Sequence, residues 1–447
     1  MNTPIRDFVD EYVKNDKMRL HMPGHKGVSF LGVEERDITE VEGADVLYHS
    51  EGIIEESQKN AESLFGSGKT LYSTEGSSLC IRAMVYLVLL QAKKEGRRPL
   101  ILAGRNAHKS FTSALALLDV DVEWLYPSKR NTLISCEIEC EDLDERLAKM
   151  PEKPVAVYIT SPDYLGTMAD IKGLAEVCHK HGALLLVDNA HGAYLKFLPE
   201  SRHPLDLGAD LCCDSAHKTL PVLTGGAYLH ISKGAPKLFY DMAAEAASLF
   251  ASTSPSYLIL QSIDMANKYI SDGYRERLTW FTSKVRKVKE RLSEYGLLLA
   301  GDEDLKITIV SKAYGYYGYE IAEYLFENGI VCEFSDRDFA VFMLTPENAD
   351  DLDRLTEVLE NLPRKSEINE AAPVPPKCER MLSVREAKTS PSVEIPVFEA
   401  NGRILASASV SCPPAIPILI CGEKIDEDAI ECFKYYGVEK CRVVEDA

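Results

Sequence analysis

The chain has 447 residues, of which 45% are hydrophobic and 27% are charged, as in a globular protein with more than one domain. Its 50 Lys and Arg against 70 Asp and Glu give a formal charge of −20, which argues against nucleic acid or an anionic membrane as a partner. No secretory signal is recognisable at the start, and no apolar run is long enough to span a bilayer. The twelve cysteines form no C-x-x-C pair, so we expect reduced thiols, a cytoplasmic protein and no metal site.

The first 55 residues predict an N-terminal arm. A short amphipathic helix places Phe8 and Tyr12 on one face, and a turn rich in Pro, Gly and polar side chains, H-M-P-G-H-K-G, begins at residue 21. His25 in this turn either caps the turn or reaches a binding site, and the sequence leaves both readings open.

A glycine- and hydroxyl-rich turn leads into the most apolar helical segment of the chain. The run from residue 79 to 95 is apolar almost all round, so we expect a buried helix that stops at Gly96. Gly76, Ser77 and Ser78 stand at its start, where N–H groups and the positive end of the helix dipole suit a phosphate. The alternative is an ordinary serine helix cap.

Strand-like and helical segments then alternate. Apolar runs at 99–103, 120–126, 155–160 and 183–188 predict an open α/β sheet, whose ligands bind outside the carboxyl ends of the strands. Polar side chains follow these ends and the end of the next strand: Arg105, Asn106, His108, Lys109, Thr160, Ser161, Asp163, Asp188, Asn189, His191, Ser215, His217 and Lys218. Their convergence on one edge predicts a binding site.

A lysine lies between two strand-like runs in the stretch from residue 209 to 230. One apolar run stops at Asp214, the polar cluster S-A-H-K-T follows, and a second run begins after Gly226. A lysine between core strands is costly to bury, and one reason to place it there is a Schiff base with a carbonyl cofactor. The alternative is a surface lysine on a loop.

The remainder predicts smaller units. A helix with an apolar stripe at Leu278, Phe281, Val285, Val288, Leu292 and Tyr295 leads into further β and α signals. We expect an arm over 1–55, a large α/β domain over 56–272, a small α/β domain over 273–363, a proline- and charge-rich linker over 364–395 and a C-terminal α+β domain over 396–447.

Asp188 and Lys218 together indicate a specific cofactor. A carboxylate at the end of an apolar strand needs a cationic partner, and a protonated pyridine nitrogen is one. Lys218 would hold the aldehyde of the same ring, the turn at 73–78 its phosphate, and His108 would lie on its open face. This set of groups is what pyridoxal phosphate requires.

The chain resembles the Orn/Lys/Arg decarboxylases, pyridoxal-phosphate enzymes of the aspartate-aminotransferase fold type I, in a compact form without the N-terminal wing domain of larger members. Eight motifs in the family's order carry the resemblance: H-M-P-G-H-K, D-I-T-E-V-E-G, S-E-G-I-I-E-E-S-Q, R-N-A-H-K-S, V-D-N-A-H-G-A-Y, S-A-H-K-T-L-P-V-L-T-G, S-T-S-P-S-Y and C-P-P-A-I-P-I-L-I-C-G-E. The chain departs from the family in T-E-G-S-S for N-G-T-T or N-G-S-T, in D-N-A-H for D-E-A-H, and in C-P-P-A-I-P for Y-P-P-G-I-P.

The resemblance implies a role for each site residue. Lys218 would be the Schiff-base lysine, with His217 beside the cofactor as a candidate proton donor. The other cofactor contacts implied are Ser215, Gly76, Ser77 and Ser78 near the phosphate, Asp188 on the pyridine nitrogen, and Ala190, His108 and His191 around the ring. His25, Glu40 and Glu423 are candidates for reading the substrate, with surface solvation as the alternative for both glutamates. No residue is assigned to a metal.

The resemblance also implies a large domain with a mostly parallel seven-stranded sheet, a smaller α/β domain and a C-terminal domain. It implies decarboxylation of a cationic amino acid (arginine, lysine or ornithine) in polyamine-type metabolism, with arginine or lysine favoured, by a homodimer with shared active sites. Two alternatives stay open: another pyridoxal-phosphate reaction, such as aminotransfer or a lyase reaction, and a non-catalytic homologue that binds the cofactor.

Overall fold

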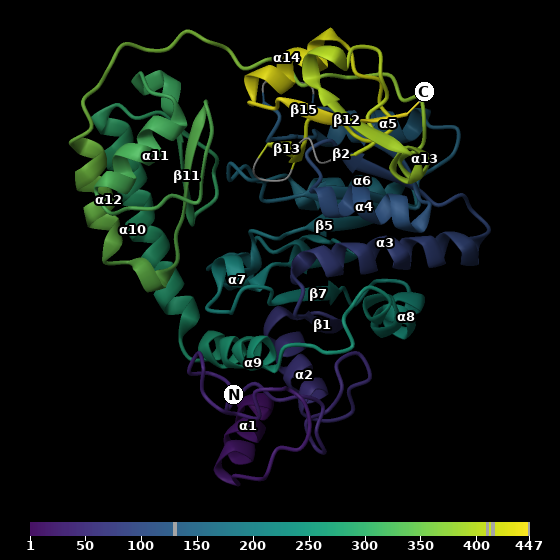
Figure 1. Cartoon of the computed structure of the whole chain (residues 1–447), viewed down its shortest axis with the longest axis vertical. Helices are drawn as coiled ribbons and strands as arrows, with labels where there is room; N and C mark the ends of the chain where they lie inside the picture. Colours follow the sequence, from purple (N-terminus) through teal and green to yellow (C-terminus); the bar gives the residue numbers. More distant parts are fainter. Residues whose placement is uncertain (128–131, 408–410, 413–415, 446–447) are drawn as a thin grey trace. The chain divides into compact units, whose positions relative to one another are not determined.

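The computed structural model describes residues 1–127, 132–407, 411–412 and 416–445, which fall into two compact units (Figure 1). The first unit comprises residues 1–97 and 171–277, and the second comprises residues 98–170 and 278–447. These units cut across the domain boundaries expected from the sequence, so those boundaries stay predictions.

The largest sheet has seven strands in the order β1-β7-β6-β5-β4-β2-β3. Its strands are β1 (Lys69–Ser73), β2 (Leu100–Gly104), β3 (Asp121–Leu125), β4 (Ala156–Thr160), β5 (Leu184–Asp188), β6 (Leu211–Asp214) and β7 (Ala227–Ile231). β7 runs antiparallel to both its neighbours, whereas the pairs β5–β6, β2–β4 and β2–β3 are parallel. The predicted α/β class with a mostly parallel sheet is therefore confirmed.

The first unit packs helices on strands β1, β5, β6 and β7. Its α-helices are α1 (Pro4–Lys14), α2 (Ile53–Phe65), α3 (Gly76–Glu95), α6 (Ile171–Lys180), α7 (Ala216–Thr219), α8 (Lys237–Ser248) and α9 (Tyr257–Ser271), with 3-10 turns η1 (Ala193–Phe197) and η2 (Pro204–Leu207). As predicted, α3 is largely buried and ends at Gly96, whose left-handed φ of 66° suits glycine. The single helical turn α7 connects β6 to the chain that enters β7.

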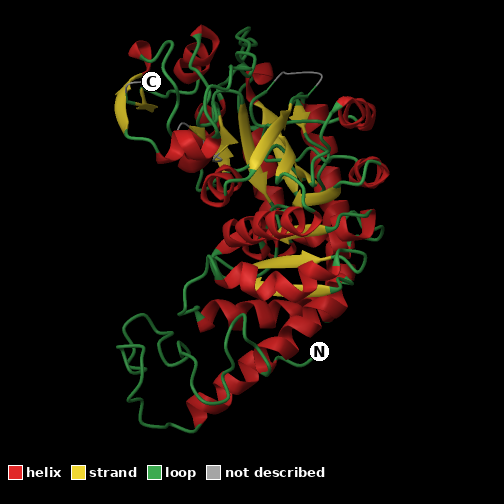
Figure 2. Ribbon diagram, turned by 90° about the vertical axis from the view of Figure 1, so that its right-hand side faces the viewer, coloured by secondary structure: helices red, strands yellow, loops and turns green. Residues whose placement is uncertain are grey.

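Residues 15–52 contain neither helix nor strand and are called the arm below; they lie within the arm of residues 1–55 expected from the sequence, whose bounds stay a prediction, and Figure 2 draws them as a long loop next to the N-terminal helix. The buried carboxylate of Asp264 on α9 anchors α1, because it accepts the backbone N–H groups of Ile5 and Arg6, each at 3.0 Å. Asp45 in the arm plays the same part for α2, accepting the N–H groups of Gly52 and Ile54. The arm is thus tied at both ends to helices whose first N–H groups need acceptors.

The second unit contains β2, β3 and β4, a four-stranded sheet and the C-terminal residues. The four-stranded sheet has the order β10-β11-β9-β8, and the remaining strands pair as β12–β15 and β13–β14. The strands are β8 (Leu299–Ala300), β9 (Lys306–Val310), β10 (Phe334–Ser335), β11 (Phe339–Met343), β12 (Ser392–Pro396), β13 (Ser411–Cys412), β14 (Ile416–Pro417) and β15 (Lys440–Val444). The helices are α4 (Lys109–Leu118), α5 (Cys140–Lys149), α10 (Tyr274–Tyr295, which begins in the first unit), α11 (Gly318–Glu327), α12 (Asp351–Glu360), α13 (Val384–Thr389) and α14 (Glu427–Tyr435), with short turns η3 (Ser311–Tyr314), η4 (Pro346–Asn348) and η5 (Val397–Glu399).

Two local expectations differ from the structure. The apolar stripe of α10 is buried from Leu278 to Leu292, but Tyr295 is 42% exposed, because the helix ends there and its hydroxyl donates to the carbonyl of Glu360. The segment expected as a linker contains α13, which Ser383 caps together with Glu386. Within the described residues, no helix is both long and apolar enough to cross a membrane.

Candidate functional site

Lys218 lies at the carboxyl end of β6, on the one-turn helix α7. Its Nζ is 2.9 Å from Nε2 of His191, which follows the end of β5. Since a lysine amine is the donor in such a pair, His191 accepts with Nε2 and carries its own proton on Nδ1. The lysine is half-buried and His191 is buried, so the structure brings these two predicted site residues together.

The turn between β1 and α3 brings hydroxyl groups to the same sheet edge. Ser215 Oγ donates to Ser77 Oγ at 2.7 Å, which joins the start of α3 to the residue after β6. Gly76 has a φ of 71° and open space where a Cβ would stand, but its N–H donates to the carbonyl of Gly225 at 2.7 Å. Ser77, Ser215 and the positive end of a 20-residue helix therefore offer groups that suit an anion, whereas the N–H of Gly76 is used within the turn.

Asp188 ends β5 as a carboxylate only 2% exposed. Its Oδ1 accepts the N–H of Ala190 at 3.3 Å and lies 3.6 Å from the thiol of Cys213. A carboxylate buried this deeply at the end of a parallel strand is suited to a cationic ligand group. The packing of Ala190 against a cofactor ring stays a prediction.

His217 is fixed through its ring. Its Nδ1 lies 3.0 Å from the carbonyl of Gly226, so Nδ1 carries the proton and donates it. The same carbonyl accepts the His217 backbone N–H at 3.2 Å. These two hydrogen bonds connect α7 to the chain that enters β7. They fix the imidazole of His217, the residue before Lys218 in the sequence.

His108 and Glu423 lie in the second unit. His108 caps α4, since its Nδ1 accepts the N–H of Ser110 at 3.2 Å, and its stacking on a cofactor ring stays a prediction. Glu423 is buried and 3.3 Å from Arg105, and it also accepts the N–H of Ile420 at 2.7 Å. Burial raises the pKa of this carboxyl, against the lowering effect of Arg105. The geometry gives Glu423 internal partners, as expected of a structural ion pair. The preceding residues 413–415 of its motif lie outside the described residues.

The two remaining candidates lie in the arm. His25 Nε2 is 3.3 Å from Asp37, and its Nδ1 accepts the N–H of Gly27 at 3.0 Å, so the imidazole organises its own turn. Glu40 is exposed. Neither is joined to the residues around Lys218 by a described contact within the first unit, and their role toward substrate stays a prediction.

A buried group that the sequence reasoning missed lies at the end of β6. Asp214, His203 and His230 converge there, all with fully buried side chains. The signal in the sequence was an aspartate closing the apolar run L-C-C-D, which needs buried partners. Which histidines supply them could not be inferred, because His203 and His230 come from separate segments.

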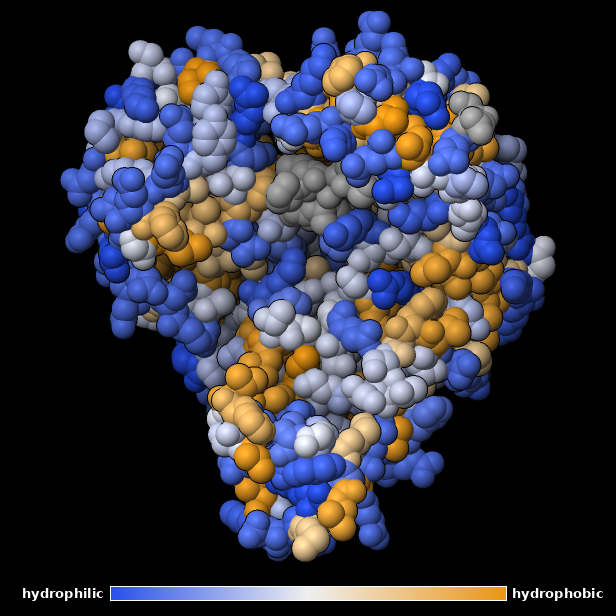
Figure 3. All heavy atoms as spheres, in the orientation of Figure 1, coloured by the Kyte–Doolittle hydropathy of each residue, from blue (hydrophilic) through white to orange (hydrophobic). Residues whose placement is uncertain are grey.

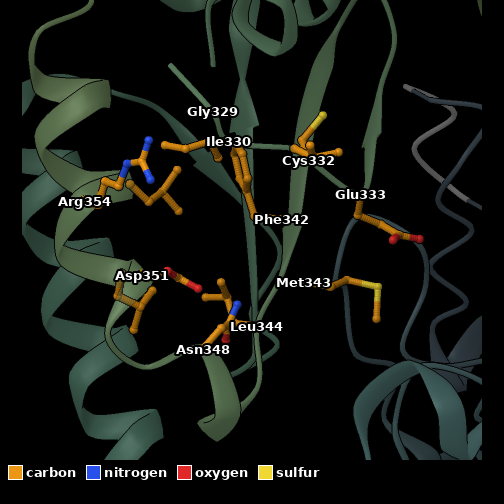
Figure 4. Close-up of a pocket in the computed structure, with 13 residues that line it drawn as sticks. Gly329, Ile330, Cys332, Glu333, Phe342, Met343, Leu344, Asn348, Asp351 and Arg354 are labelled. Carbon is orange, nitrogen blue, oxygen red and sulfur yellow. The ribbon is translucent and has the colours of Figure 1, made fainter. Parts of the chain in front are cut away.

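Surface hollows lie in the second unit, and one of them, of about 470 Å³, is lined by the predicted site residue Glu423 together with Tyr126 and Arg380. A second, of about 440 Å³, is lined by α12, β11 and the chain before β10, including Ile330, Phe342 and Arg354 (Figure 4). A third, of about 570 Å³, has acidic side chains and includes Asn106. Among the described residues that line the second hollow, none is a predicted site residue.

Comparison with known proteins identifies the family to which the chain is similar. A search of family profiles matches residues 3–295 to "Orn/Lys/Arg decarboxylase, major domain". An arginine decarboxylase of Bacillus subtilis is 29% identical over 464 residues, covering 96% of this chain and 92% of that protein. One of Halalkalibacterium halodurans is 29% identical, covering 95% and 91%.

Solved structures share the fold. The lysine decarboxylase of Francisella novicida has a TM-score of 0.79 at 18% identity, covering 99% of this chain and 81% of that one. An alanine–glyoxylate aminotransferase from Nostoc has a TM-score of 0.55 over 69% of this chain. The profile match extends over well more than half of the 447 residues and includes both Lys218 and Asp188. The chain is a member of the Orn/Lys/Arg decarboxylase family.

Proposed function

We propose that this protein removes the α-carboxylate of arginine or lysine as carbon dioxide with the help of pyridoxal 5'-phosphate. The observation that carries the proposal is the Lys218–His191 pair at the carboxyl ends of β5 and β6, beside the buried Asp188. Family membership supplies the reaction class. The curated relatives named arginine decarboxylase and the solved lysine decarboxylases support the choice of a basic substrate.

The residues present fit the cofactor. Ser77, Ser215 and the N-terminus of α3 suit its phosphate, and the buried carboxylate of Asp188 suits its pyridine nitrogen. Lys218 is the amine placed to hold its aldehyde, with Ala190 and His108 proposed for the two faces of the ring and Ser78 for the phosphate.

Four side chains have separate roles in the proposed reaction. When bound, the cofactor supplies the electron sink into which the electrons of the broken carboxylate bond pass. Asp188 keeps a proton on the ring nitrogen by its negative charge. His191 Nε2 accepts a hydrogen bond from Lys218 Nζ at 2.9 Å and so orients the amine. Lys218 or His217 returns the proton to the α-carbon, and the Nδ1–H bond of His217 to Gly226 leaves Nε2 as its acid–base atom.

Charge supports a basic substrate, and the relatives support the choice among basic amino acids. A net charge of −20 favours the approach of a cationic amino acid. Because the relatives are named arginine and lysine decarboxylases, we infer arginine or lysine in preference to ornithine, and amine products of the polyamine type. The role of His25 and Glu40 in reading the substrate is part of this proposal, whereas we assign Glu423 to the ion pair with Arg105.

We also propose a cytoplasmic homodimer with shared active sites. Support comes from the arm, which exposes large apolar side chains: Met18 at 83%, Leu20 at 84%, Phe30 at 77% and Leu31 at 87%. Figure 3 shows apolar residues on the lower part of the molecule, where Figure 1 draws the arm. Exposed apolar residues grouped in one segment are typical of a protein interface.

The test is release of carbon dioxide from arginine, lysine and ornithine by the protein supplied with cofactor, beside the Lys218→Ala variant. We expect turnover with arginine or lysine, loss of turnover in the variant, and loss of the visible absorption that a lysine-bound cofactor gives. Formation of a 2-oxo acid in place of carbon dioxide would instead show aminotransfer. Bound cofactor without turnover of any of the three would show a non-catalytic homologue.

A further inference from the structure

A buried carboxylate lies directly before the turn that carries Ser215 and Lys218. Asp214 Oδ2 is 3.0 Å from Nε2 of His203 and 3.4 Å from Nε2 of His230, and Asp214 Oδ1 accepts from the side-chain amide of Asn189 at 2.7 Å. The aspartate and both histidines have fully buried side chains. The ring of Phe65 covers both imidazoles, with ring centroids 5.5 Å and 4.5 Å away.

The hydrogen bonds made by the Nδ1 atoms of the two imidazoles determine whether their Nε2 atoms present a proton to Asp214. His203 Nδ1 accepts the backbone N–H of Leu205 at 3.4 Å, so the proton of this ring is on Nε2. His230 Nδ1 is 2.8 Å from the hydroxyl of Thr70, which has Ser67 as a further partner at 2.7 Å. With Thr70 as donor, His230 also turns an N–H toward the carboxylate.

The two imidazoles stabilise the carboxylate anion of Asp214 and do not suit a metal ion. Nitrogens that carry hydrogens offer no lone pair to a metal, although the spacing of the three side chains is within the range of metal ligands. Burial by itself would raise the pKa of Asp214, but the interactions of its carboxylate with His203, at 3.0 Å, and with His230, at 3.4 Å, outweigh it and hold that pKa below its usual range. Burial lowers the pKa of His230, so its neutral form is favoured.

Asn189 connects this carboxylate to the next strand. It stands between Asp188 and Ala190, and its backbone N–H donates to the carbonyl of Cys213 at 3.0 Å. Backbone and side chain of Asn189 therefore bind two consecutive residues of β6, Cys213 and Asp214. The side chain also requires Gly192, where a Cβ would lie 2.0 Å from Asn189 Oδ1.

We propose that Asp214 is a positioning residue of the decarboxylation site: its carboxylate, held by His203, His230 and Asn189, fixes the turn bearing Ser215 and Lys218 relative to Asp188. The proposal rests on the proposed function, in which Lys218 and Asp188 hold opposite sides of one ring. It also accounts for the D-N-A-H motif of this chain. A glutamate in place of Asn189 would bring a second carboxylate against Asp214, whereas the amide donates to it.

The decisive variant is Asp214→Asn, with Asp210→Asn as a matched control. Asp210 precedes β6 at its other end and is also a buried carboxylate bonded to a histidine and to β5, accepting from His179 at 2.9 Å and from the N–H of Leu185 at 2.8 Å. In Asp214→Asn, the new side-chain amide would face the amide of Asn189. The Asn189 side chain would then have to rotate, and Asn189 is the residue next to Asp188. Both variants remove one buried carboxylate at an end of β6, but only Asp214 lies beside the site.

We expect both variants to lower Tm, and only Asp214→Asn to lower kcat, by about tenfold or more with little change in KM, as for a small misplacement of reacting groups. Only Asp214→Asn should weaken cofactor binding to the apo-protein and change the visible spectrum of the Lys218-bound cofactor. Asn189→Ala, which spares both histidines, should act in the same direction and serves if Asp214→Asn fails to fold.

The proposal is overturned if folded Asp214→Asn, or Asn189→Ala in its place, keeps the parental kcat, spectrum and cofactor affinity, or if Asp210→Asn changes them equally. It is also overturned by stoichiometric metal in the purified protein that Asp214→Asn loses. Wild-type protein that binds cofactor without releasing carbon dioxide would refute the proposed function instead, while the spectrum and affinity would still test Asp214.

Discussion

Replacing Glu423 by glutamine distinguishes a structural ion pair from a substrate-reading carboxylate. Arg105 and Glu423 have side chains 5% and 6% exposed, and Arg105 also donates to the carbonyls of Pro417 and Ile418 at 3.0 and 2.9 Å. At an effective dielectric constant of about 20, two unit charges separated by 3.3 Å attract by about 5 kcal/mol. Glutamine keeps an acceptor for Ile420 but leaves the guanidinium charge buried without a counter-ion.

We expect Glu423→Gln to lower the free energy of unfolding by about 3–5 kcal/mol, the range found when one partner of a buried pair is removed. For a unit of this size that corresponds to a fall in Tm of roughly 10 °C. The KM for arginine and lysine should stay the same in protein that remains folded. Urea denaturation and steady-state kinetics on one preparation give both numbers.

A double-mutant cycle with Arg105→Met supplies the control. If the two side chains act as a pair, the double variant loses less stability than the sum of the single variants, by about 0.5–3 kcal/mol. An unchanged Tm together with a KM raised about tenfold or more would contradict this reasoning and return Glu423 to the substrate.

Three further predictions concern other parts of the chain. Asp188→Asn should retain part of the cofactor binding but reduce kcat by about 100-fold, and near-normal turnover would remove its role at the ring nitrogen. Burial raises the pKa of Asp264 to about 6, against the hydrogen bonds from Ser57, Arg6 and Ile5, so this group contributes stability below its ordinary value of 3.8 that is lost as pH rises through about 6. Asp264→Asn should therefore lack this pH dependence in urea titrations between pH 4 and 7, and a variant whose stability falls with pH as steeply as that of the parent would contradict the assignment to Asp264. The double variant Leu20→Ser with Leu31→Ser should shift the mass measured by light scattering from dimer to monomer, and an unchanged mass would show that the arm lies outside the interface.

The sequence was most informative where one residue type has few physical alternatives. Gly96 ends α3 with a left-handed backbone, and Lys218 follows a strand whose apolar residues leave it at the sheet edge. Both could be predicted because strand ends and helix ends are local features. The α10 stripe was equally readable up to its last turn, where Tyr295 leaves the core.

Partners of buried charges could not be predicted, because they are tertiary contacts. Arg105 and Glu423 are 318 positions apart in the chain, and nothing in either neighbourhood identifies the other. Glu423 was a candidate for binding the substrate because its motif belongs to the family. In the fold, its carboxylate instead pairs with Arg105 within the second unit. The N–H of Gly76 is likewise engaged by the carbonyl of Gly225, a contact between two turns that the phosphate-loop pattern does not show.

Lysine is a flexible side chain, and a single helical turn is a weak support for it, since α7 spans only four residues. The precision that the proposed chemistry needs must then come from the residues around that turn. The carbonyl of Gly226 holds both the backbone and the ring of His217. Directly before the turn, Asp214 accepts hydrogen bonds from Asn189 and His203 and lies 3.4 Å from His230 on β7. A buried anion bonded on both of its oxygens is costly to displace, so the turn that bears Lys218 is held more firmly than its length would allow.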